Sequence, residues 1–137
     1  MDARQIELVQ ASFAKVVPIA DQAAVIFYDE LFKLDPSLRA LFADDLTEQR
    51  AKLMKMLGTA VNGLRDWDVI QPAVASLGAR HVGYGVTATH YSTVGAALLS
   101  TLEKGLGDAF TPQVRAAWAE VYQALSSTMI AAEKLPA

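Results

Sequence analysis

The chain has 137 residues, of which 53% are hydrophobic and 20% are charged, and its net charge is −3. A chain of this length can bury one hydrophobic core, so we expect a single domain over residues 1–137. The acidic balance argues against nucleic acid or an anionic membrane as a partner. The chain has no cysteine, which excludes a disulfide scaffold, a thiol nucleophile, a cysteine-type zinc site and covalently attached haem.

The N-terminal segment, Met1–Glu7, has neither the basic flank nor the continuous apolar stretch of a signal peptide. No apolar run in the sequence approaches membrane-spanning length. We therefore expect a soluble, cytoplasmic protein.

Helical periodicity runs along the whole chain, and the alternation of apolar and polar residues that is typical of strands is absent. The pattern predicts a first helix over residues 2–17, which Pro18 ends because its ring removes a donor and clashes with the preceding turn. A second helix is predicted over residues 19–34, and a short third helix over 36–41 is capped by Asp35 and begun by Pro36. The apolar face of the second helix holds Ala24, Phe27, Tyr28, Leu31 and Phe32.

The middle of the chain is predicted to form one long helix and one weaker helix. A polar connection over residues 42–47 leads into a helix over 48–64. Asp66-Trp67-Asp68 is expected to break it, and the weaker helix covers residues 70–81, before a corner at Gly83 and Gly85. The inward face of the long helix is expected to hold Gln49, Leu53, Met56, Leu57 and Ala60.

Two further helices are predicted after this corner. Thr87 can cap the first of them, which ends at Gly107-Asp108, and Thr111-Pro112 begins the second with a cap and a proline together. Their inward stripes hold Tyr91, Val94, Leu98, Leu102 and Leu106 in the first, and Val114, Trp118, Tyr122, Leu125 and Met129 in the second. Seven to eight helices of uneven length argue against a four-helix bundle and favour an all-α fold crossed around a pocket.

The two histidines, His81 and His90, are candidates for iron binding, because histidine is the commonest nitrogen ligand of haem iron. His81 lies at a predicted helix end, from which a ring can project into a gap between helices. On its own, a lone histidine is equally compatible with an ordinary core or surface role. The same holds for Tyr28 and Gln49, each of which has an ordinary structural interpretation when it is taken singly.

Aromatic, proline and histidine residues recur in a fixed order along nearly the whole chain. The two most specific stretches are Phe27-Tyr28-Asp29-Glu30-Leu31-Phe32 and Gly85-Val86-Thr87-Ala88-Thr89-His90-Tyr91. Further matching positions are Asp35-Pro36, Leu41-Phe42, Gln49, Leu53, Arg80-His81, Val94-Gly95, Leu98-Leu99, Trp118, Tyr122 and Glu133. This pattern resembles the single-domain bacterial haemoglobins and the haem domain of flavohaemoglobins, which implies a globin fold around a non-covalent haem b.

The resemblance implies a role for each matching position. His81 matches the proximal ligand of the haem iron, whereas His90 matches a position that does not bind iron. Phe42 matches the phenylalanine that packs on the porphyrin face, and Leu53 matches the distal aliphatic residue above the iron. The side chains expected to line the porphyrin are Leu57, Leu77, Val86, Val94, Leu98 and Leu125.

Polar residues are implied on both sides of the haem. Tyr28 and Gln49 match the distal pair, whose O–H and N–H groups stabilise bound dioxygen because that ligand carries partial negative charge. Tyr91 and Glu133 match the proximal network that holds the ligand histidine and makes its ring more electron-rich. The resemblance therefore implies high oxygen affinity with slow release.

Two charged residues are expected near the pocket. Arg80 and Lys52 are candidate partners for the anionic haem propionates, and each is equally compatible with a solvated surface charge. The stretch from Phe42 to Gln49 looks shorter than in many flavohaemoglobins, so the register of Gln49 depends on its spacing to Leu53.

The resemblance favours a protein that binds dioxygen, with carbon monoxide and nitric oxide as further small ligands. The enzymatic activity that the resemblance implies is nitric oxide detoxification, in which nitric oxide and dioxygen give nitrate and leave ferric haem. Because the chain has no G-x-G-x-x-G motif and no room for a flavin or nicotinamide module, turnover would require a separate reductase. The alternatives are an oxygen store or gas sensor without turnover, and a globin-shaped protein without haem. Either a monomer or a homodimer is compatible with the sequence.

Overall fold

The structure is a computed structural model that describes residues 2–83 and 88–133, with side chains described for all of these except 77–83, 88, 132 and 133. The described part contains six α-helices, four short 3₁₀ segments and no strand, so the predicted all-α class is confirmed. In chain order the elements are α1 (Ala3–Val16), η1 (Val17–Ile19), α2 (Ala20–Leu34), η2 (Pro36–Leu41), α3 (Thr47–Asn62), η3 (Leu64–Asp66), α4 (Trp67–Gly83), α5 (Ala88–Leu106), η4 (Gly107–Ala109) and α6 (Pro112–Glu133).

The helix starts predicted from cap and proline pairs are confirmed. Asp35 accepts a hydrogen bond from the Ser37 backbone N–H at 3.1 Å, directly before η2. The Thr111 hydroxyl oxygen accepts one from the Val114 N–H at 3.2 Å, directly before α6. These side chains satisfy N–H groups that the first turn of a helix leaves without a partner.

The predicted number of seven to eight helices differs from the six α-helices of the described residues. The main reason is the segment Pro36–Leu41, which forms a 3₁₀ helix with i to i+3 hydrogen bonds from Leu38 to Asp35 and from Phe42 to Arg39. A six-residue stretch that begins with proline is too short to gain from α-helical bonding, and 3₁₀ segments commonly serve as such connectors.

The boundary between α3 and α4 was also predicted incorrectly. Asp66-Trp67-Asp68 does not break a helix: α3 ends at Asn62, Gly63 follows it, and α4 begins at Trp67. Asp68 lies in the first turn of α4, where a carboxylate is stabilised by the positive end of the helix dipole. A further difference concerns Met56, which is 38% exposed rather than inward, while Val61 is the buried residue of α3.

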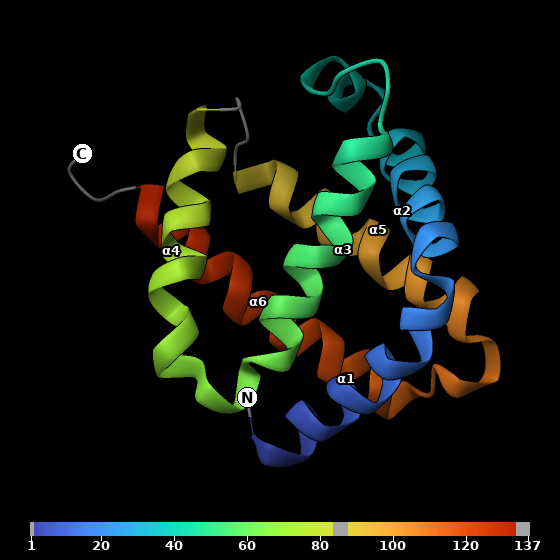
Figure 1. The fold of residues 1–137 in the computed structure, drawn as a ribbon, viewed down its shortest axis with the longest axis vertical. Coiled ribbons are helices and arrows are strands. Elements are labelled where there is room, and N and C mark those ends of the chain that lie inside the picture. Colours follow the sequence, from blue (N-terminus) through green and yellow to red (C-terminus); the bar gives the residue numbers. More distant parts are fainter. Residues whose placement is uncertain (1, 84–87, 134–137) are drawn as a thin grey trace.

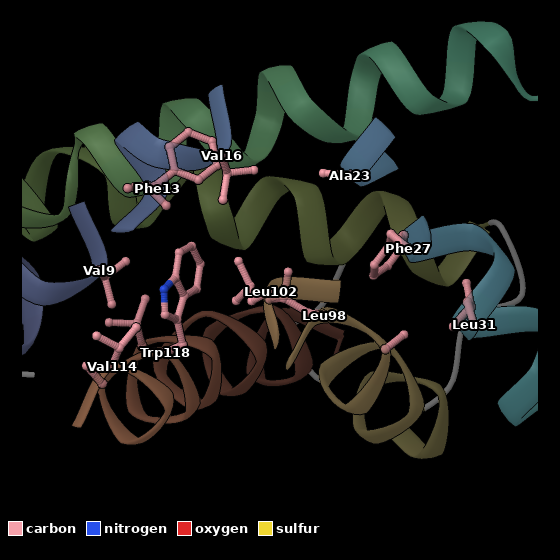
Figure 2. Close-up of a cluster of buried hydrophobic side chains, with 14 of the residues drawn as sticks. Val9, Phe13, Val16, Ala23, Phe27, Leu31, Leu98, Leu102, Val114 and Trp118 are labelled. Atoms are coloured by element: carbon pink, nitrogen blue, oxygen red, sulfur yellow. The ribbon is translucent and has the colours of Figure 1, made fainter. Parts of the chain in front are cut away.

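The core is formed where helices from both halves of the chain pack together (Figure 1). α2 packs on α5, and α6 packs on both α1 and α4. Figure 2 shows side chains from four of these helices converging: Val9, Phe13 and Val16 of α1, Phe27 and Leu31 of α2, Leu98 and Leu102 of α5, and Val114 and Trp118 of α6. The buried indole N–H of Trp118 donates to the Ser12 hydroxyl at 2.8 Å, which joins α1 to α6.

One stretch, Ala3–Leu34, is long and apolar enough to cross a membrane by length and composition, contrary to the sequence-based expectation. In the structure it consists of α1, the 3₁₀ turn at Pro18, and α2. Its apolar residues Phe13 and Phe27 are buried in the core. The stretch is therefore accounted for as two core helices.

Helices α3 and α4 are joined by η3 and run in opposite directions (Figure 1). As a result, the start of α3 and the end of α4 lie at the same end of the molecule. In its described residues α3 packs on α2 and α1, whereas α4 packs on α6. Within the described residues, α3 and α4 therefore pack mainly on different helices of the core.

Candidate functional site

Tyr28 lies at the centre of a group of aromatic rings. It is 3% exposed, and its ring centroid is 5.0 Å from that of Phe27, 6.0 Å from that of Phe32 and 5.6 Å from that of Phe42. The ring centroids of Phe32 and Phe42 are 5.7 Å apart. We call these four residues the Tyr28 cluster. They come from α2 and from the residue that follows η2, so the cluster fixes the connection between these elements.

The hydroxyl of Tyr28 is held neutral and has a polar neighbour. Burial raises the pKa of Tyr28 above its usual value, while a hydrogen bond shared with the Gln49 side chain and the positive charge of Arg50 oppose that rise. Gln49 lies at the start of α3 and is half-buried. The structure therefore brings Tyr28, Phe42 and Gln49 together, as the sequence predicted for a distal pocket.

The neighbouring side of α3 is apolar but incompletely covered. Leu53 and Leu57 are half-buried and pack against the core, and only Val61 of this 16-residue helix is fully buried. Half-buried leucines on a helix that lies beside a core leave apolar surface for a further apolar group to cover. Lys52, on the same helix, is exposed, where a cation can meet an anionic group at a pocket rim.

Helices α5 and α6 supply the other predicted pocket residues. Leu98 and Tyr91 are buried at 8% and 6% exposure, and Val94 and Leu125 are half-buried beside the core. The Tyr122 hydroxyl donates to the Tyr91 carbonyl at 2.6 Å, so α6 holds the beginning of α5 in place.

The remaining predicted residues are placed only by their elements or lie outside the described residues. His81, Arg80 and Leu77 belong to α4, with His81 two residues before its end, but their side chains are outside the described part. Glu133 is the last residue of α6, with its side chain likewise outside it, and Val86 lies outside the described residues altogether. Their predicted roles stay predictions.

Three residues that the sequence did not assign to the site also contribute to this region. Phe32 backs the Tyr28 ring, Arg50 acts on the Tyr28 hydroxyl by its charge, and Arg39 binds the backbone that follows η2. Phe32 had a signal, because it lies on the predicted apolar face of α2. Arg39 had none, because its contacts depend on how the residues after η2 fold back. Arg50 follows Gln49 directly in the sequence, so its place near the pocket depends on the register of Gln49.

A buried phenol and a neutral amide beside half-buried leucines give a mostly apolar lining with a few polar groups, which is the lining typical of cofactor and small-molecule sites. The Globin family profile matches residues 25–129, most of the chain. The chain therefore belongs to the globin family, which implies a haem cofactor.

Relatives and solved structures agree with this assignment. The chain is 28% identical to neuroglobin of Dissostichus mawsoni, over 90% of this chain and 86% of the relative, and 29% identical to neuroglobin of Danio rerio, over 77% and 75%. An engineered carbene transferase from Rhodothermus marinus, assigned provisionally as a nitric oxide dioxygenase, superposes with a TM-score of 0.86 at 25% identity, covering 97% of this chain and 93% of that one. A bacterial globin from Campylobacter jejuni has the same fold, with a TM-score of 0.82 at 24% identity and coverage of 97% and 96%. The predicted resemblance to bacterial globins is confirmed.

Proposed function

We propose that this chain holds haem b without a covalent bond, with His81 as the iron ligand, and binds dioxygen tightly beside Tyr28 and Gln49. The observation that carries the proposal is the buried Tyr28 phenol, which lies inside a group of phenylalanines with the Gln49 side chain near enough to oppose the rise of its pKa. Neutral donors in apolar surroundings suit a ligand that is uncharged in solution and becomes partly negative when bound.

The residues of the distal side have separable tasks in this proposal. The Tyr28 phenol is protonated at neutral pH, and burial raises its pKa further, so it can donate its hydroxyl proton in a hydrogen bond. Gln49 offers a second donor without a charge, which avoids the cost of burying an unpaired ion. Phe42 and Leu53 exclude water, and a dry site strengthens both hydrogen bonds.

The porphyrin would be covered by apolar residues that the structure leaves half-buried, Leu53, Leu57, Val94 and Leu125, together with the buried Leu98. Leu77 and Val86 complete this lining in the proposal. Tyr91 and Glu133 would orient the His81 ring, and Arg80 and the exposed Lys52 would meet the propionates.

We further propose that the chain consumes nitric oxide in the cytoplasm. When bound, haem supplies an open iron coordination position for the gases and one electron, with which nitric oxide and dioxygen give nitrate. Each turnover then requires one electron from outside. We assign the supply of this electron to a reductase.

The test is steady-state consumption of nitric oxide by the haem-loaded protein with excess dioxygen and a generic flavin reductase. We expect consumption above that of free haem, and a lower rate for Tyr28→Phe. Dioxygen should also dissociate faster from Tyr28→Phe, because about 1–3 kcal/mol of stabilisation is lost. Consumption no faster than that of free haem would contradict the enzymatic part of the proposal. Slow dioxygen release that is unchanged in Tyr28→Phe would contradict the role of Tyr28.

A further inference from the structure

Arg39 binds the backbone that carries Phe42. One guanidinium nitrogen, Nη1, donates to the carbonyl oxygens of Phe42 at 3.3 Å and Ala43 at 2.9 Å. The other, Nη2, donates to the carbonyl oxygen of Asp44 at 2.9 Å. These three carbonyls follow the end of η2, where no helix supplies a donor. A single side chain therefore holds three consecutive residues of the connection to α3.

The same guanidinium also lies on an aromatic ring of the Tyr28 cluster. Its central carbon is 5.4 Å from the centroid of Phe32, within the range of a cation–π contact. Phe32 in turn contacts Tyr28 and Phe42. Arg39 thus holds Phe42 through its backbone and Phe32 through its ring, and these two rings flank Tyr28.

We propose that Arg39 is a positioning residue that fixes the direction of the Tyr28 hydroxyl by immobilising the two phenylalanines beside it. The inference rests on the function proposed above, in which that hydroxyl faces the bound gas. Arg39 has no part in the chemistry itself. It reduces the freedom of the rings that confine the phenol, so that the donor is oriented before the ligand arrives.

The geometry requires arginine rather than a positive charge alone. The flat guanidinium presents several N–H donors in one plane and stacks by its face, so it can serve three carbonyls and a ring at once. A lysine ammonium is compact and strongly hydrated and cannot make this set of contacts. Arg39→Lys therefore keeps the charge and removes the positioning.

The test compares Arg39→Lys with Arg115→Lys in the haem-loaded protein. Arg115 is a suitable control because its side chain is 55% exposed and its contact with Glu103, at 3.9 Å, is long. We expect Arg39→Lys to raise the dioxygen dissociation rate by roughly three- to tenfold, the scale of one displaced hydrogen bond. Arg115→Lys should leave the rate unchanged.

A spectroscopic readout separates positioning from a general loss of stability. In the carbon monoxide complex, the C–O stretching band reports the donor that faces the ligand. We expect Arg39→Lys to add a second band at the frequency of the Tyr28→Phe protein, because part of the population loses the oriented hydroxyl. Arg39→Gln, which keeps amide donors but not the stacking, provides a second variant should the lysine variant not fold.

A double substitution completes the experiment. If Arg39 acts through Tyr28, Arg39→Lys should no longer change the dissociation rate when residue 28 is phenylalanine. An effect that persists at full size in that background would overturn the inference, as would a single unshifted band in Arg39→Lys. If Tyr28→Phe itself leaves dissociation unchanged, the role proposed above for Tyr28 is wrong and the inference falls with it. If Tyr28→Phe accelerates dissociation and Arg39→Lys does not, only the inference is wrong.

Discussion

Tyr28 is a buried polar residue whose phenol remains protonated. Its ring is packed among phenylalanines, and its hydroxyl has the half-buried Gln49 as a polar neighbour. Burial disfavours the phenolate, so the pKa of Tyr28 rises and the group remains a hydrogen-bond donor. An ionised phenol could only accept and would repel a partly negative ligand.

This protonation state predicts a flat pH profile. In the haem-loaded protein, the dioxygen dissociation rate should stay constant from neutral pH to pH 10, the ordinary pKa of tyrosine, and rise only beyond it, because the folded-state pKa is higher. Stopped-flow measurements across this range provide the check, with Tyr28→Phe as the reference that lacks the titrating group. An inflection below pH 10 that disappears in Tyr28→Phe would contradict the raised pKa.

At the scale of elements, α6 packs closely against a glycine of α5. A β-carbon at Gly95 would lie 2.7 Å from Cε2 and 3.0 Å from Cδ2 of Tyr122, whose hydroxyl is tied to the Tyr91 carbonyl. The ring cannot retreat without breaking that hydrogen bond. This contact therefore depends on the absence of a side chain at residue 95.

Gly95→Ala is accordingly expected to lower the free energy of unfolding by about 1–3 kcal/mol, the usual cost of overpacking. Gly58→Ala is the matched control: its β-carbon would meet the Phe13 ring at an ordinary 3.7 Å, and alanine should stabilise the helix by about 0.5–1 kcal/mol. Urea unfolding of both variants measures the difference. Equal effects of the two substitutions would contradict this account of the contact.

Helices α2 and α5 are also joined by an ion pair. The Glu30 carboxylate accepts from the Lys104 ammonium and from the Ser100 hydroxyl at 3.4 Å, and Lys33 lies 3.8 Å away. The hydrogen bond from Lys104 lowers the pKa of Glu30 below its usual value of 4.5. The stabilisation is therefore present above pH 4.5 and is lost as the pH falls through the lower, folded-state pKa.

Glu30→Gln should lower the melting temperature at pH 7, and the difference from the unaltered protein should shrink as the pH falls below 4.5. Glu103→Gln is the control, because that carboxylate is 67% exposed and its 3.9 Å contact with Arg115 should contribute little. Melting curves of the three proteins between pH 3 and pH 7 test this. A difference for Glu30→Gln that grows toward acid pH would have the wrong sign.

The elements also show what local sequence could predict. Asp35-Pro36 and Thr111-Pro112 located two helix starts correctly, because a cap and a proline act within one turn. Asp66-Trp67-Asp68 misled, because the same aspartate that disfavours a helix interior stabilises a helix start. Met56 was placed inward by periodicity alone, which does not reveal how far a helix is rotated against its neighbours.

At the scale of the molecule, the chain returns on itself. Ser12 and Trp118, from opposite ends of the sequence, share a buried hydrogen bond of 2.8 Å that joins α1 to α6. The pair α3 and α4 lies beside this core, with the start of one helix and the end of the other at the same end of the molecule (Figure 1). Gln49 belongs to the first turn of α3, and His81 to the last turn of α4.

The candidate site could be predicted from the sequence only in part. The resemblance to bacterial haemoglobins supplied Tyr28, Gln49 and Phe42, and the structure brings these three together. Arg39 could not be found in this way, because its partners are backbone carbonyls of a loop whose path the side-chain pattern does not encode.

The most direct test of the account is the visible absorption spectrum of the purified protein in its ferric, reduced, carbon monoxide and oxygenated forms, beside His81→Ala. We expect a strong Soret band that shifts when carbon monoxide is added to the reduced protein, and its loss or alteration in His81→Ala. A colourless protein that does not take up added haem would contradict the account.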